Sequence, residues 1–165
     1  MPTIYSYQKY IDSQVTRELN FPTDTSGQRL GTELATVNGI TYVTLPTGAT
    51  LPSDQPTEIA ATVQAVVLDA ATKDLIFKAS PHAKFMERLV DDHLAAEAKA
   101  KGYDSIVSAC SYMGVANPYQ VESQSFVSWR GAVWTKCYAV LDEVLSGTRD
   151  MPTPAAMIAE LPVRA

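Results

Sequence analysis

The pattern of apolar and polar residues predicts strands in the N-terminal half of the chain. The strongest local signal is a pair of β-prone runs, residues 32–37 and 40–45, separated by Asn38-Gly39. Asn-Gly supplies the positive φ angles that a type I′ turn requires, so this segment is predicted to form a β-hairpin. A two-residue loop pairs Val37 with Ile40, Ala35 with Tyr42, and Leu34 with Val43. An isolated hairpin is marginal in water, so we expect helices, further strands or another chain to cover it.

The segment before the hairpin has a helical spacing of apolar residues. Over residues 4–19 they fall close to one stripe of a helix, and Phe21-Pro22 closes the segment. The stripe comprises Ile4, Tyr7, Ile11, Val15 and Leu19. We therefore expect a short amphipathic helix, which would pack either on its own domain or, as an arm, on a neighbouring subunit.

Residues 46–56 are rich in proline, glycine and serine and predict a long loop of the kind that often carries contacts. The next segment, residues 57–68, has an ambiguous period. Alternation of Ile59, Ala61, Val63, Ala65 and Val67 fits a strand, while a subset of its apolar residues also fits a helix. The β-branched content favours a strand.

The C-terminal half has helical periodicity and recognisable helix boundaries. Asp69 can cap a helix over residues 70–79, and Ser80-Pro81 can start a longer one that ends at Gly102. A short helix is expected from Asp104 and Ser105 through Tyr112, and a short final one after Pro154.

The last long helix is predicted over residues 118–146 and has two neighbouring apolar stripes, wide enough to be buried against two neighbours. One stripe comprises Phe126, Trp129, Val133, Cys137, Val140 and Val144, and the other Trp134, Tyr138, Leu141 and Leu145.

Together these elements predict an α+β protein with a small antiparallel sheet in the N-terminal half and a helical C-terminal half. We expect a helix or arm plus hairpin over residues 1–56 and a mainly helical module over 57–165. The chain has 165 residues, of which 46% are hydrophobic, so it is long enough to bury a sizeable core.

The charge of the chain argues against nucleic acid as its main partner. The formal net charge is −5, and the 13 lysines and arginines are scattered rather than clustered. No apolar run approaches the ~20 residues of a membrane span, and the N-terminus lacks the pattern of a signal peptide. We therefore expect synthesis and folding in the cytoplasm, without membrane insertion.

Candidate catalytic and metal-binding residues are few. His82 and His93 lie eleven residues apart on one predicted helix, roughly 16 Å, which is too far to share a metal ion. Cys110 and Cys137 lie within apolar helical patterns and are expected to be buried free thiols. Acidic pairs such as Asp91-Asp92 and Asp142-Glu143 are typical of exposed helix faces. We predict no catalytic residue, no metal ligand and no cofactor.

Trp129 and Trp134 allow two interpretations. They are five residues apart, about 140° around a helix, so they flank its apolar face rather than stack. They could be core anchors, or they could form an interface or ligand surface, where tryptophan is enriched. Arg130 between them is expected to pair with Glu122 or Asp104.

One further pattern lies in the segment from about residue 99 to 162, which ends with Pro152-Thr153 to Leu161-Pro162. Its positions are Gly102, Tyr103, Asp104, Ser105, Ser108, Ala109, Cys110, Ser111, Tyr112, Asn117, Pro118, Phe126, Trp129, Arg130, Val133 and Trp134. With these residues the segment resembles a C-terminal module of bacteriophage tail-associated proteins, including tail-fibre assembly proteins. The stretch from Leu51-Pro52 to Ser80-Pro81-His82 is similar to other phage tail proteins more weakly.

This resemblance implies a non-enzymatic structural component of the phage tail, at the baseplate, tail tip or fibre attachment. Its partners would be other tail, baseplate and fibre proteins in an oligomeric assembly, and its final location the virion. We expect the N-terminal half, with Asn38-Gly39 and residues 46–56, to contact those partners. A tail-fibre assembly chaperone is the first alternative. A small ligand-binding or enzymatic domain that uses the Trp129/Trp134 face is the second.

Overall fold

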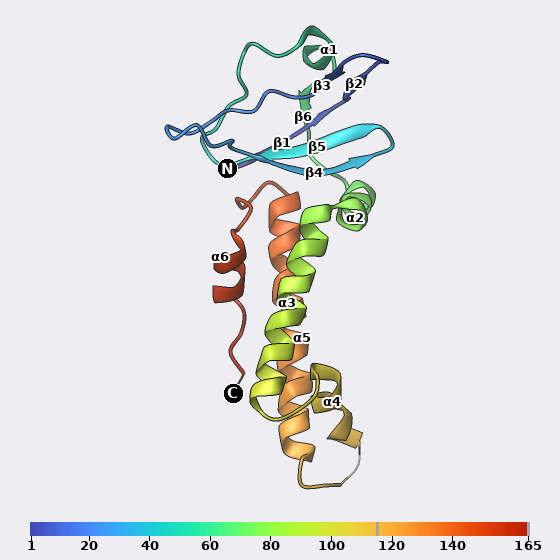
Figure 1. Ribbon diagram of the computed structural model, residues 1–165, viewed down its shortest axis with the longest axis vertical. Helices are drawn as coiled ribbons and strands as arrows, with labels where there is room; N and C mark the ends of the chain where they lie inside the picture. Colours follow the sequence, from blue (N-terminus) through green and yellow to red (C-terminus); the bar gives the residue numbers. More distant parts are fainter. Residues whose placement is uncertain (115, 165) are drawn as a thin grey trace. The chain divides into compact units, whose positions relative to one another are not determined.

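The computed structural model describes residues 1–114 and 116–164 and has an α+β fold, as the sequence predicts (Figure 1). The chain forms two compact units. We call the first the sheet unit, which comprises Met1–Ala83 and Asp142–Met151. We call the second the helical unit, which comprises Lys84–Leu141 and the chain from Pro152 onward. Each unit is therefore assembled from two separate stretches of sequence.

The sheet unit contains a four-stranded sheet with the strand order β4-β5-β1-β6, in which every neighbouring pair is antiparallel. Its strands are β1 (Thr3–Tyr7), β4 (Thr32–Val37), β5 (Ile40–Leu45) and β6 (Gln64–Ala65). Strand β1 lies between β5 and β6, with Tyr5 opposite Val43 on one side and Ala65 on the other. A separate two-stranded ribbon is formed by β2 (Tyr10–Ile11) and β3 (Thr16–Arg17).

The predicted N-terminal helix is wrong, because residues 3–7 form a central strand. In β1, the buried Ile4 and Ser6 alternate with Thr3 and Tyr5, as expected where both faces of a strand have neighbours. Strand pairing on both sides thus outweighs a helical spacing that only a few residues supported. Ile11, a member of the predicted stripe, is instead 70% exposed in the β2–β3 ribbon.

The predicted β4–β5 hairpin is confirmed, with one change of register. Val37 pairs with Ile40 and Ala35 with Tyr42, and the turn places Asn38 at φ 52° and Gly39 at φ 78°. A β-bulge between Glu33 and Ala35 then shifts the pairing, so Val43 lies opposite Glu33 rather than Leu34. Leu34 is the extra, unpaired residue of the bulge, and its side chain is buried in the core.

Residues 57–68 do not form the single strand that the alternation favoured. They fold as a short helix, α1 (Thr57–Ala60), followed by the two-residue β6. Ile59 of α1 is fully buried, and it belongs to the same core cluster as Tyr7, Leu19 and Val43. Helix α2 (Ala70–Ala79) follows, with the predicted cap: the Asp69 carboxylate accepts a hydrogen bond from the Thr72 amide at 2.7 Å.

The helices of the C-terminal half begin and end near their predicted boundaries. Ser80 caps α3 by accepting from the Ala83 amide, Ser105 caps α4 in the same way, and Gly102 has φ 87° after α3. The elements are α3 (Pro81–Ala100), α4 (Ile106–Cys110), a 3₁₀ turn η1 (Ser111–Gly114), α5 (Gln120–Leu145) and α6 (Pro154–Ala159).

The core of the helical unit contains side chains from α3, α4, α5 and the C-terminal segment. Its buried members are Val90, Leu94, Ala98, Ala109, Phe126, Trp129, Val133, Val140, Met157 and Leu161. The first predicted stripe of α5 is thereby confirmed as a buried face, with Cys137 half-buried. In the second stripe Tyr138 is exposed.

The end of the chain is bound to this core by three directed contacts. The Trp129 indole N–H donates to the Pro162 carbonyl at 2.6 Å. The Arg164 guanidinium lies 4.1 Å from the centre of the Phe126 ring and 3.6 Å from a Glu97 carboxylate oxygen. These contacts hold residues 162–164 in place without secondary structure.

Candidate functional site

The two cysteines are poorly suited to nucleophilic chemistry. Both are free and half-buried, and burial raises the pKa of each thiol above its ordinary value. For Cys110, the charge of Arg130 opposes this effect without cancelling it. A raised pKa reduces the thiolate fraction at neutral pH, and the thiolate is the reactive form.

The two histidines lie in different units. His82 belongs to the sheet unit, where burial lowers its pKa and so favours the neutral ring. His93 belongs to the helical unit, and its ring lies edge-on to Trp129 with centroids 5.7 Å apart. Over residues 1–114 and 116–164, no group of three or more His, Cys, Asp or Glu side chains could hold a metal ion.

The two tryptophans have different surroundings. Trp129 is only 6% exposed and is enclosed by the core of the helical unit, so it is a core anchor rather than a binding surface. Trp134 is half-buried and lies against Tyr138, with ring centroids 6.0 Å apart. Glu122, one expected partner of Arg130, instead accepts a hydrogen bond from the Tyr103 hydroxyl at 2.9 Å.

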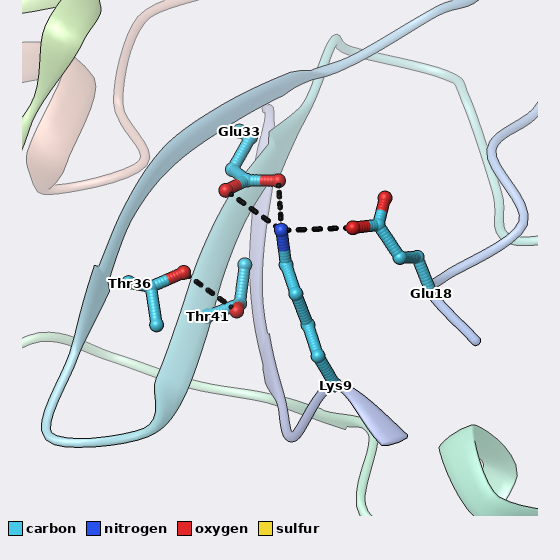
Figure 2. A network of polar contacts seen from close by, with 5 residues as sticks. All are labelled: Lys9, Glu18, Glu33, Thr36 and Thr41. Carbon is cyan, nitrogen blue, oxygen red and sulfur yellow. Dashed lines mark hydrogen bonds and ion pairs between the residues drawn. The ribbon is translucent and has the colours of Figure 1, made fainter. Parts of the chain in front are cut away.

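A polar network surrounds Lys9 in the sheet unit. Figure 2 shows its ammonium between two carboxylates, 3.1 and 3.2 Å from the oxygens of Glu33 and 3.1 Å from Glu18. Burial alone would lower the pKa of Lys9, but hydrogen bonds to the two carboxylates outweigh it and raise the pKa above its ordinary value. A lysine held protonated is neither a base nor a nucleophile, so this network is structural.

The Lys9 network also connects separate segments of the sheet unit. It joins the segment after β1 to Glu33 at the bulge of β4, and the hydroxyls of Thr36 and Thr41 meet at 2.9 Å across the hairpin (Figure 2). The bulge therefore has a side-chain partner in Lys9.

Several exposed apolar residues belong to elements at one end of the helical unit, and we call this set the tyrosine patch. It comprises Val107 of α4, Tyr112 and Met113 of η1, Tyr119 just before α5, and Val121 in the first turn of α5. Tyr119 is 55% exposed and Val121 85%. Figure 1 shows α4 and the start of α5 at the same end of this unit.

A chain of aromatic rings connects the tyrosine patch to the buried core. The rings of Tyr119 and Tyr112 have centroids 5.5 Å apart, and Tyr112 lies 6.1 Å from Tyr103. Tyr103 in turn meets Phe126 edge-on at 5.5 Å. Asn117 connects Tyr112 and Tyr119, because its side-chain amide donates to the Tyr112 carbonyl and its side-chain oxygen accepts from the Tyr119 amide. The exposed rings are therefore linked by ring contacts to the buried core.

Sequence reasoning missed the tyrosine patch and expected contacts in the N-terminal half. A usable signal was Val121, an apolar residue in the first turn of α5 that lies outside both predicted apolar stripes. A single exposed apolar residue is common on protein surfaces, so this signal becomes informative only together with the neighbouring tyrosines.

Comparisons with known proteins found no matching family model, no matching curated protein and no matching solved structure. Within the part of the chain that the structure describes, no helix combines the length and apolar character needed to cross a membrane.

Proposed function

We propose that this chain is a non-enzymatic component of a bacteriophage tail, at the baseplate, tail tip or fibre attachment. It would act through contacts with other tail proteins and reach its final location in the virion. The observation that carries the proposal is the tyrosine patch, which lies inside the segment, residues 99–162, that resembles tail-associated proteins.

The chemistry of the patch suits a protein partner. Tyrosine gives a large contact area for few rotatable bonds and keeps a hydroxyl for hydrogen bonding, so it is enriched where binding energy concentrates. Because Tyr112 lies against both Tyr103 and Tyr119, these rings are already restricted and less rotational freedom is lost on binding. The complementary surface would be apolar with a few hydrogen-bonding groups, as the core of a protein interface is.

The proposal is tested on purified particles of the phage that encodes this chain. Quantitative mass spectrometry should detect the chain in a fixed ratio to a known tail protein after density-gradient purification. If the chain is absent from particles but co-purifies with a fibre protein from infected cells, the assembly-chaperone alternative replaces this proposal. If it is found with neither, the tail assignment fails.

The role of the patch is tested by complementation of a phage that lacks the gene. A variant with Tyr119→Ser and Val121→Ser should reduce incorporation into particles by about tenfold or more, because side chains at interface centres dominate binding. Val163→Ser is the matched control, since Val163 is also highly exposed but lies outside the patch. Equal incorporation of the patch variant and the control would exclude the patch as the contact.

A further inference from the structure

The two edges of the four-stranded sheet differ in how well they are protected against pairing with a further strand. Strand β4 contains the bulge at Glu33/Ala35 and packs against α2, and both features hinder pairing with another strand. Strand β6, at the other edge, lies in a stretch from Ile59 to Leu68 that contains no charged residue and no proline. Natural proteins protect exposed edges with charges, prolines or very short strands. Strand β6 has the short length, two residues, but neither charge nor proline, so its edge is open to a short pairing.

The hydrogen bonds between β1 and β6 show which backbone groups of β6 face outward. The Val66 amide donates to the Ile4 carbonyl at 2.9 Å, and Ser6 lies opposite Gln64. In an antiparallel pair, hydrogen-bonded residues alternate with residues whose N–H and C=O point away. Ala65 therefore directs these groups to the free edge, where no described residue pairs with them. Strand β6 ends at Ala65, but the Val66 bond continues the same alternation by one residue, and we infer the outward direction of the Val67 groups from it.

The side chains at this edge are apolar and accessible. Val67 is 95% exposed, and Ala65 is also exposed. Beside them is a recess of about 310 Å³, whose lining includes Met1, Ile4, Val67 and Leu145, all within the sheet unit. An occupant of this edge would gain backbone hydrogen bonds and apolar contact at the same time.

We propose that β6 pairs with β6 of a second copy of this chain, antiparallel and about a twofold axis. In the symmetric register centred on Val66, Ala65 of each copy lies opposite Val67 of the other, and the outward groups form four backbone hydrogen bonds. The edge is self-complementary, because each copy offers the exposed Val67 side chain and the apolar surface beside it. A net charge of −5 repels copies elsewhere on the surface, but the uncharged 59–68 stretch lets them meet without repulsion.

This inference does not depend on the tail assignment, because it concerns the purified chain alone. Sedimentation velocity of the full chain, without an N-terminal tag beside Met1, should show a reversible monomer–dimer equilibrium between ~10 µM and ~1 mM, the range expected of a small interface. Added salt should strengthen the dimer, because it screens the net negative charge.

Two substitutions test the geometry. Ala65→Pro removes an outward N–H and leaves the β1–β6 hydrogen bonds intact, since those use Gln64 and Val66. It should weaken the dimer about tenfold or more, because each copy loses one backbone hydrogen bond. Ala65→Ser, which keeps the N–H, is the control. Val67→Lys places at this edge the residue that edge strands use against pairing, and it should weaken the dimer by a similar factor. Val67 does not contribute to the core, so Val67→Lys is expected to fold and still tests the edge if Ala65→Pro does not fold.

Amide exchange measured by NMR tests the register. The Ala65 and Val67 amides should gain protection as concentration rises, while Gln64 and Val66, already bonded within the sheet, should not. A chain that is monomeric throughout this range overturns the inference. A dimer that both substitutions leave unchanged also overturns it, because that dimer would use another surface.

Discussion

Replacement of Gly31 by alanine should destabilise the sheet unit far more than the same change at Gly48. Both glycines have positive φ, +100° at Gly31 and +84° at Gly48, so alanine is strained at either position. Their surroundings differ. A Cβ at Gly48 would meet no atom within 4 Å, whereas one at Gly31 would lie 2.5 Å from Leu45 Cδ2 and 2.9 Å from the Thr44 carbonyl oxygen.

The magnitude follows from two separate costs. Backbone strain for alanine at positive φ is about 1–2 kcal/mol, and it applies to both variants. The clash at Gly31 adds a cost typical of overpacking, about 1–3 kcal/mol. Neither neighbour can move easily, because Leu45 and Thr44 are buried in the central strand β5. We expect Gly31→Ala to lower the free energy of unfolding by ~2–5 kcal/mol and Gly48→Ala by only the strain component.

Urea unfolding followed by far-ultraviolet circular dichroism measures both variants under one condition. The difference between them isolates the clash, since the strain is common to both. If Gly31→Ala and Gly48→Ala lose the same stability, the close approach of β5 to residue 31 does not hold and the reasoning fails.

Two further changes probe single hydrogen bonds. Trp129→Phe removes the donor to the Pro162 carbonyl and should cost about 1–3 kcal/mol in urea unfolding, followed through Trp134 fluorescence; unchanged stability would show that this bond is not needed. Asp69→Ala removes the cap of α2 and should lower the melting temperature at pH 7. The Thr72 amide lowers the pKa of Asp69, so this stabilisation is present above the ordinary aspartate pKa and is lost as pH falls through the lowered one. The melting temperatures of wild type and variant should therefore converge in acid, and a constant gap would contradict the cap.

Elements whose signal is local could be predicted from the sequence. Asn38-Gly39 encodes its turn through backbone conformation alone, and Asp69, Ser80 and Ser105 cap helices through their own side chains. Elements determined by contacts with residues far away in the sequence could not be predicted. Strand β1 is a strand because β5 and β6 pair with it on either side. The sequence of residues 4–19 alone does not indicate those partners.

The same distinction between local and distant signals explains which features of the core, the sheet and the surface could be predicted. The burial of Trp129 could be predicted, because it lies on a long apolar stripe of α5. The bulge at Glu33/Ala35 could not be predicted, because the two-residue turn implies a regular register and no residue near Leu34 in sequence marks the shift. The exposure of Tyr112 and Tyr119 also depends on ring contacts between residues outside one helix, which periodicity does not encode.

The interleaving of the two units along the chain has a consequence for synthesis on the ribosome. Neither unit corresponds to a continuous stretch, since the sheet unit needs Asp142–Met151 and the helical unit needs the chain after Pro152. Met157 and Leu161, two buried members of the helical core, are synthesised after the second stretch of the sheet unit. Domains of most proteins fold in order as they leave the ribosome. Here neither unit can complete its core until the stretch after Asp142 has emerged, and a chain released before that point would expose two incomplete cores to proteases.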